Sequence, residues 1–158
     1  MKVSYDWVND NNAIGLALVG NGDIAAFTSL TGGGTEVANI TVTPSESGCI
    51  GATESFILTV NDLDDPSFDY APGLTYCQTA ADPTTNLTGM AGGTFTYTAV
   101  SGGPTLDINT ATGDITLLTS DLGVYDITYN TAGAPGSLCP QTFTLQFVIT
   151  GAPVADFT

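Results

Sequence analysis

The sequence predicts an all-β protein, and three observations support this prediction. Threonine, valine, isoleucine, tyrosine and phenylalanine, which fit a pleated and half-buried surface, are frequent, whereas good helix formers are scarce. Segments of strand length are apolar or alternate between apolar and polar residues, and Gly-Gly, Gly-Asp or Pro separates them. No segment has the apolar spacing of about 3.6 residues that indicates an amphipathic helix. We therefore expect two-sheet sandwiches with Greek-key connections.

An internal repeat divides the chain. The matching positions are Gly22-Asp23-Ile24 with Gly113-Asp114-Ile115, Ile40 with Ile127, Cys49 with Cys139, and Val60 with Ile149. These pairs lie 87 to 91 positions apart (127 − 40 and 113 − 22), so the repeat is about 90 residues long. This is the size of an immunoglobulin-like β-sandwich, which the repeat therefore predicts.

Each copy is expected to consist of strands and turns. In the first copy, "YDW" predicts a strand whose Trp7 fills the sandwich core. In the second copy, the patterns predict strands over residues 94–100, 124–130 and 143–150. The acidic residues stand mostly in turns such as "NGD", "TGD" and "SDLG", where aspartate serves the backbone geometry.

The two copies are not equally complete. Residues 1–62 are predicted to form an incomplete sandwich without its opening strands, and residues 63–151 a complete one. Residues 152–158, "APVADFT", resemble "DPSFDY" and predict the first strand of a following repeat. The opening "MKVSYDWVND" has no apolar stretch of a signal peptide. We expect the chain to be a segment of a longer tandem array.

The repeat also bears on the three cysteines. Cys77 and Cys139 fall near the two ends of the second copy, and the prediction is a disulfide between them. Cys49 is the counterpart of Cys139, and it stays unpaired because its partner would lie in the missing opening of the first copy. The alternative is that all three are reduced thiols.

The charge excludes several functions. Sixteen acids face one lysine or arginine, and the net charge is −15, so nucleic acid and anionic lipid surfaces are excluded as partners. No window is long enough to insert into a membrane. Without histidine there is no Ser-His or Cys-His catalysis and no His-ligated zinc. Composition alone leaves a glycosidase carboxylate pair open. Because most acids stand in turns, we expect no enzyme.

The acidic stretch "VNDLDDPSFDY" lies at the junction of the two copies. Calcium takes six to eight oxygen ligands, and this stretch could supply several of them, from Asn61, Asp62, Asp64, Asp65 and Asp69. The alternative is a solvated acidic linker, which we favour because the matching junction "ITGAPVADF" lacks the acid cluster. No cofactor is required, and calcium is the one candidate ion.

Nearly the whole chain resembles a family. The second half contains "DDPSFDYAPGLTYCQTAADPTTNLTGMAGGTFTYT", "LDINTATGDITLLTSDLGVYDITYN" and "CP". It resembles the Ig-like repeats of giant Bacteroidetes cell-surface adhesins, the gliding-motility type that type IX secretion exports. The first half, from "VSYDWVNDNNAIGLALVGNGDIAAFT" to "ITVTPSESGCIGATESFILTV", resembles the PKD-like repeat found beside them. The resemblance implies tandem β-sandwich stalks at the cell surface, with no catalytic residues.

The predicted function is a non-catalytic stalk or adhesion repeat of a bacterial surface protein, located outside the cell. Its expected partners are neighbouring repeats or subunits of the same protein, with surface glycans as a further possibility. One alternative is a carbohydrate-binding module of a secreted enzyme, with Trp7 and tyrosines stacking on sugars. The other is a filament subunit, in which the strand-like tail fills the open sheet edge of a neighbour.

Overall fold

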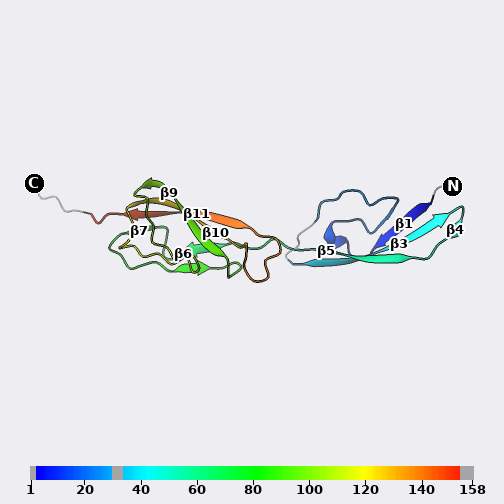
Figure 1. Cartoon of the computed structure of the whole chain (residues 1–158), viewed down its shortest axis with the longest axis horizontal. Helices are drawn as coiled ribbons and strands as arrows, with labels where there is room; N and C mark the ends of the chain where they lie inside the picture. Colours follow the sequence, from blue (N-terminus) through cyan, green and yellow to red (C-terminus); the bar gives the residue numbers. More distant parts are fainter. Residues whose placement is uncertain (1–2, 30–33, 154–158) are drawn as a thin grey trace, which may run out of the picture. The chain divides into compact units, whose positions relative to one another are not determined.

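The computed structural model describes residues 3–29 and 34–153, and it confirms the all-β sandwich class. The described residues form eleven strands and one short 3-10 helix, and none of their helices is long and apolar enough to cross a membrane. The chain divides into two compact units, Met1–Leu63 (unit 1) and Asp64–Thr158 (unit 2), coloured blue to teal and green to red in Figure 1. This division falls one residue from the boundary expected after residue 62.

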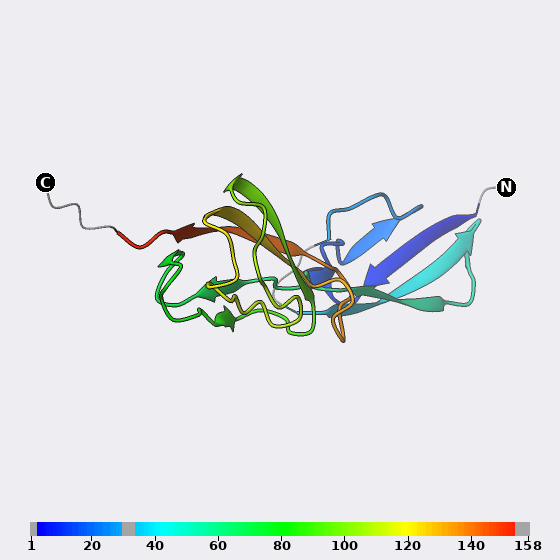
Figure 2. The ribbon, with the colours of Figure 1, turned by 60° about the vertical axis from the view of Figure 1, so that its left-hand side comes forward.

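Unit 1 contains one antiparallel sheet. Its elements are β1 (Ser4–Asn9), η1 (Asn12–Ile14), β2 (Val19–Asn21), β3 (Glu36–Glu46), β4 (Cys49–Ile50) and β5 (Glu54–Val60). The strand order is β2-β1-β3, and β3 pairs on its other edge first with β5 and then with β4, because it is the longest strand. Figure 2 shows β2, β1 and β3 as neighbouring arrows.

The core of unit 1 lies on one face of this sheet. It is formed by Trp7, Ile14, Leu16, Ala38 and Ile40. The side chain of Asn11 caps η1 by accepting a hydrogen bond from the Ala13 N–H at 2.9 Å, which holds Ile14 over the sheet. Trp7 is 7% exposed and therefore lies in the core, as its strand context predicts. Among the described residues of unit 1, loop residues and no second sheet cover this face.

Unit 2 has two layers. The first sheet has the order β7 (Thr75–Cys77), β11 (Thr142–Thr150), β10 (Gly123–Asn130) and β9 (Thr94–Gly102). The second sheet pairs β6 (Phe68–Tyr70) with β8 (Thr85–Leu87), and Figure 1 shows β6 opposite β9 and β11. Strand β7 runs parallel to β11, whereas the other pairs are antiparallel. The strands predicted over residues 94–100, 124–130 and 143–150 are thus present as β9, β10 and β11.

Aromatic rings fill the core of unit 2. The ring of Phe68 from β6 meets the ring of Phe95 edge-on at 5.1 Å, and that of Tyr70 meets Phe147 at 5.1 Å. Burial raises the pKa of Tyr70 to about 12, and its hydroxyl donates to the Gly113 carbonyl at 2.6 Å. The short strands of the second sheet are therefore held by side-chain packing rather than by an extended hydrogen-bond ladder.

A tyrosine corner joins the start of β10 to the residues that connect β9 and β10 in unit 2. Tyr125 stands near the start of β10, and its hydroxyl lies 2.8 Å from the Asp121 carbonyl oxygen, 2.9 Å from that of Thr105 and 3.2 Å from that of Gly103. Burial raises the pKa of this phenol. A tyrosine that bonds back to the backbone just before its strand is a hallmark of immunoglobulin-like sandwiches.

The two units contain the same three-stranded sheet. In unit 1, β3 pairs with β5 through Ala38↔Leu58 and Ile40↔Phe56. In unit 2, β10 pairs with β11 through the matching pairs Tyr125↔Phe147 and Ile127↔Leu145. On the other edge, Trp7↔Val42 of β1 and β3 corresponds to Phe95↔Tyr129 of β9 and β10. The internal repeat thus extends to the register of the strands, and unit 1 has no described counterpart of β6, β7 and β8.

Candidate functional site

Asp64 anchors the first residues of unit 2. Its side chain accepts hydrogen bonds from the hydroxyl groups of Thr131, at 2.8 Å, and Ser137, and its backbone N–H donates to the Cys139 carbonyl at 3.1 Å. The bond from Ser137 is the main cause that holds the pKa of Asp64 below its ordinary value of 3.8, and burial opposes this shift. These partners assign Asp64 a structural role.

The other carboxylates of the acidic stretch also bond to their own backbone. Asp62 accepts from the Leu63 N–H at 3.0 Å, and Asp69 accepts from the Tyr70 N–H at 2.7 Å. Asp65 accepts from the Ser67 N–H at 2.9 Å, and its hydrogen bonds to Ser67 lower its pKa. Such turns need no ion to hold them.

The structure does not assemble the predicted calcium ligands. Within residues 3–29 and 34–153, no three acidic or cysteine side chains converge into a group that could hold a metal ion. Of the five residues proposed from the sequence, Asp64 is buried and hydrogen-bonded inside unit 2, and Asn61, Asp62, Asp65 and Asp69 follow the chain on either side of it. Calcium binding at this stretch stays a hypothesis from the sequence.

The prediction of a Cys77–Cys139 disulfide is wrong for this structure, which forms no bond between them. Cys77 lies opposite Thr150, at the end of β11, whereas Cys139 precedes Thr142, where β11 begins. The nine residues of β11 therefore separate the two cysteines by about 27 Å. A disulfide requires Cα atoms within about 7 Å. Cys49, the cysteine expected to be unpaired, is an exposed thiol on β4.

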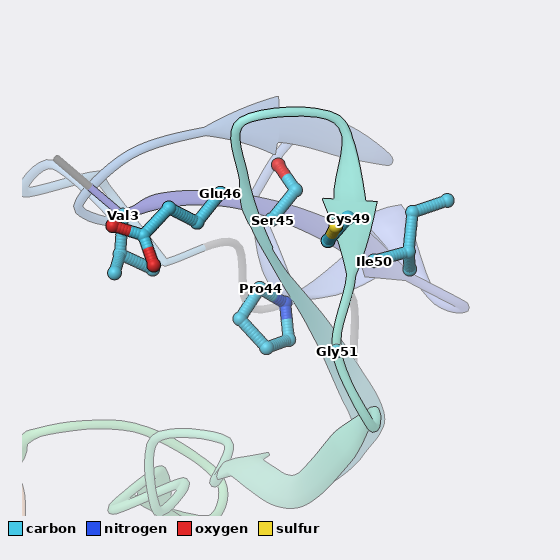
Figure 3. A pocket seen from close by; sticks show the side chains of 7 residues that line it. All are labelled: Val3, Pro44, Ser45, Glu46, Cys49, Ile50 and Gly51. Atoms are coloured by element: carbon cyan, nitrogen blue, oxygen red, sulfur yellow. The ribbon is translucent and has the colours of Figure 1, made fainter. Parts of the chain in front are cut away.

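A shallow hollow of about 270 Å³ lies beside the β3–β4 hairpin of unit 1 (Figure 3). Its lining residues are Val3, Pro44, Ser45, Glu46, Cys49, Ile50 and Gly51. The hairpin closes tightly here, since the Gly51 N–H donates to the Pro44 carbonyl at 2.8 Å and a Cβ on Gly51 would lie 2.8 Å from the Pro44 ring. Among these described residues, Glu46 is the one carboxylate, so the lining offers no acid–base pair.

A row of apolar side chains on β5 extends the core face of unit 1. Phe56, Leu58 and Val60, called the β5 row below, point to the same face of the sheet as Ala38 and Ile40. Phe56 is 47% exposed, and Leu58 and Val60 are half-buried. Their counterparts on β11 are Leu145, Phe147 and Ile149, of which Phe147 is 0% and Ile149 2% exposed.

The sequence alone does not identify the β5 row. Val60 matches Ile149 in the repeat, and the same offset pairs Leu58 with Phe147 and Phe56 with Leu145. The alternating pattern predicts that these side chains face a core. The pattern does not show whether other strands cover these side chains, because such strands lie elsewhere in the chain.

The comparisons with known proteins leave the family open. No family model matches the chain, and no curated protein matches it. The resemblance to surface-adhesin repeats thus stays a prediction from the sequence.

Proposed function

We propose that this chain is a non-catalytic stalk repeat of an extracellular bacterial surface protein. Its function is to span a distance and to transmit tension between its two ends. The proposal is supported by the parallel pairing of β7 with β11. Strand β7 lies near the beginning of unit 2 in sequence, and β11 near its end. These two strands therefore receive a load that is applied to the two ends of the unit.

The hydrogen bonds between the strands lie across the direction of the load. The Val148 N–H donates to the Leu74 carbonyl at 2.8 Å, and the Gln78 N–H donates to the Thr150 carbonyl at 2.9 Å. The Tyr76 ring also stacks on Phe147 with centroids 5.3 Å apart. Pulling the strands apart lengthwise must break these contacts together rather than one after another. A unit of this kind is suited to resisting extension.

Single-molecule stretching of the intact chain tests this proposal. Val148→Pro removes the N–H that bonds to Leu74 while the ring faces the short β7 edge, and it should lower the unfolding force of unit 2. Thr144→Ala is the matched control, since Thr144 lies on the same strand outside the segment paired with β7. Equal unfolding forces for the Val148→Pro variant and the original chain would overturn the mechanical role.

The rival function, a carbohydrate-binding module, is tested by thermal unfolding with a panel of glycans. A ligand that binds the folded state raises the melting temperature, so a stalk should show no shift with any glycan. Trp7, which the rival function would place against a sugar, is buried in the core. A reproducible shift with one glycan class would favour the binding module instead.

A further inference from the structure

Asn21 and Gly22 form the one Asn-Gly dipeptide of the sequence. In such a dipeptide the backbone nitrogen of the glycine can attack the side-chain carbonyl carbon of the asparagine, because glycine has no Cβ to hinder the approach. Asn21 is exposed at the end of β2. Among the described residues beyond its chain neighbours, nothing lies within 4 Å of the position that a Cβ of Gly22 would take. The two reacting groups are therefore not shielded by packing.

The pairing of β2 with β1 keeps the two groups from reacting. The Gly22 N–H donates to the Tyr5 carbonyl at 2.7 Å, and Asn21 lies opposite Asp6 in the antiparallel ladder. The attack requires the Gly22 N–H to lose its proton and the nitrogen to turn towards the Asn21 side chain. A hydrogen-bonded N–H at the end of a paired strand does neither until the strand opens. The folded unit therefore protects Asn21 through a backbone hydrogen bond.

Strand β2 is built to open more easily than the rest of the sheet. It has three residues, and in the described part of unit 1 it pairs with β1 alone. Short strands at the edge of a sheet separate locally at a lower cost than the unfolding of the whole unit. An open hollow of about 700 Å³, lined by residues 3–6 and 21–23, gives water access to this end of the ladder. The reaction at Asn21 should therefore follow the local opening of β2.

The matching turn of unit 2 lacks the reactive dipeptide. Gly22 corresponds to Gly113 in the repeat, and both glycines have the left-handed backbone, with φ of 71° and 80°. The residue before Gly113 is Thr112, whose hydroxyl donates to the Asp114 carboxylate at 2.8 Å. A threonine has no side-chain carbonyl for the glycine nitrogen to attack. The turn therefore does not require asparagine, and the labile dipeptide is particular to unit 1.

We propose that Asn21 is a site of spontaneous deamidation, which the pairing of β2 with β1 protects and the local opening of β2 exposes. The Gly22 nitrogen forms a bond to Cγ of Asn21, and the side-chain amino group leaves with the proton of the Gly22 N–H as ammonia. The product of this step is a cyclic imide. One water molecule then opens the imide and leaves aspartate or isoaspartate at position 21. Water is the one co-reactant, and no group is oxidised or reduced.

Both products should weaken unit 1. A carboxylate at position 21 lies directly opposite Asp6 and two residues before Asp23, and like charges opposite one another destabilise a strand pair. Isoaspartate also adds one carbon to the backbone of β2, which shifts Gly20 from its place against the Trp7 ring. The reaction is irreversible, so each opening of β2 converts a fraction of the copies to a form that opens more readily.

Mass spectrometry of the intact chain, incubated in buffer and in denaturant and then digested, tests the protection. Deamidation of the peptide that contains Asn21 should be at least about tenfold slower in buffer, because the reaction waits for β2 to open. Gly20→Ala, which crowds the Trp7 ring, should raise the rate in buffer and leave the rate in denaturant unchanged. Gly73→Ala, in unit 2, is the matched control and should leave both rates unchanged.

Two substitutions at position 21 test the consequence. Asn21→Asp carries the charge of the product and should lower the denaturant midpoint of the Trp7 fluorescence transition. Asn21→Thr takes the side chain of the matching Thr112, and it should keep the midpoint and show no mass change at this position. Equal deamidation rates in buffer and in denaturant, or no reaction in denaturant, would overturn the proposed site. An unchanged midpoint in the Asn21→Asp variant would overturn the weakening of unit 1.

Discussion

At the residue scale, Asp64 shows how a carboxylate in an acidic linker becomes part of a fold. The sequence places it among four other oxygen-bearing side chains and suggests an ion ligand. In the structure, two hydroxyl groups, from Thr131 and Ser137, bond to it instead. These partners lie 67 and 73 positions further along the chain, so local spacing could not indicate them.

Asp64 should make unit 2 sensitive to acid. Its folded-state pKa lies below the ordinary value of 3.8, so its ionised form stabilises the fold above pH 3.8. This contribution is lost as the pH falls through the lower folded-state pKa. We expect Asp64→Asn to reduce the difference in unfolding free energy between pH 5 and pH 3, as measured by denaturant titration. An unchanged difference in the variant would contradict this role.

Gly20 should be essential for unit 1. A Cβ at this position would lie 2.1 Å from Cζ2 of Trp7. Only a residue without a side chain therefore fits against the indole ring at this point of β2. We expect Gly20→Ala to destabilise unit 1 by about 1–3 kcal/mol, as overpacking of a filled core does. Trp7 is the sole tryptophan, and its fluorescence during denaturant titration reports this change. Gly73→Ala is the control, because open space surrounds Gly73 and unit 1 should keep its stability.

At the scale of single elements, long strands were predictable and short ones were not. The sequence indicates β9, β10 and β11 because each has eight or nine residues in which the apolar positions alternate. Strands β6, β7 and β8 have three residues each, which is too few for a pattern. Their places depend on the packing of Phe68, Tyr70 and Tyr76 against rings of β9, β10 and β11.

The cysteine prediction failed at this same scale. The separation of Cys77 and Cys139 along the chain gives only the size of the loop between them. In the structure they lie at opposite ends of β11, because Cys77 pairs with its last residue and Cys139 precedes its first. Spacing alone therefore gives no information on whether two cysteines can meet.

Unit 2 should accordingly be insensitive to reducing agents. We expect equal midpoints of unit 2 unfolding, followed by tyrosine fluorescence, with and without a thiol reductant. A disulfide that closes a loop of this size would add roughly 4 kcal/mol, and its reduction would shift the midpoint strongly. The double variant Cys77→Ser, Cys139→Ser serves as the control, and a drop in its stability that matches a reductant effect would contradict the structure.

At the scale of the whole molecule, each unit contains an equivalent three-stranded sheet. The units differ in how many further strands cover that sheet. The repeat was visible from the sequence, and the described part of unit 1 contains no counterpart of β6, β7 and β8. The consequence for β5 was not visible, because it requires knowing that β7 pairs with β11 and that β6 covers Phe147. Unit 2 shows which strands and rings cover the strand that corresponds to β5.

Unit 1 should therefore be the less stable unit. Its core cluster has five buried residues, whereas that of unit 2 has twelve. We expect Trp7 fluorescence to change at a lower denaturant concentration than the tyrosine signal, since five of the six tyrosines belong to unit 2. Coincident transitions, or a later change in Trp7, would show that unit 1 gains stability from elsewhere.

The parallel pairing of β7 and β11 also determines how far one repeat carries the chain. The polypeptide enters unit 2 beside the start of β11 and leaves at its end, so unit 2 carries the chain forward by roughly the 27 Å of that strand. If repeats like unit 2 form the proposed stalk, its reach grows in proportion to the number of repeats, and duplication of a single gene segment lengthens it without any new fold.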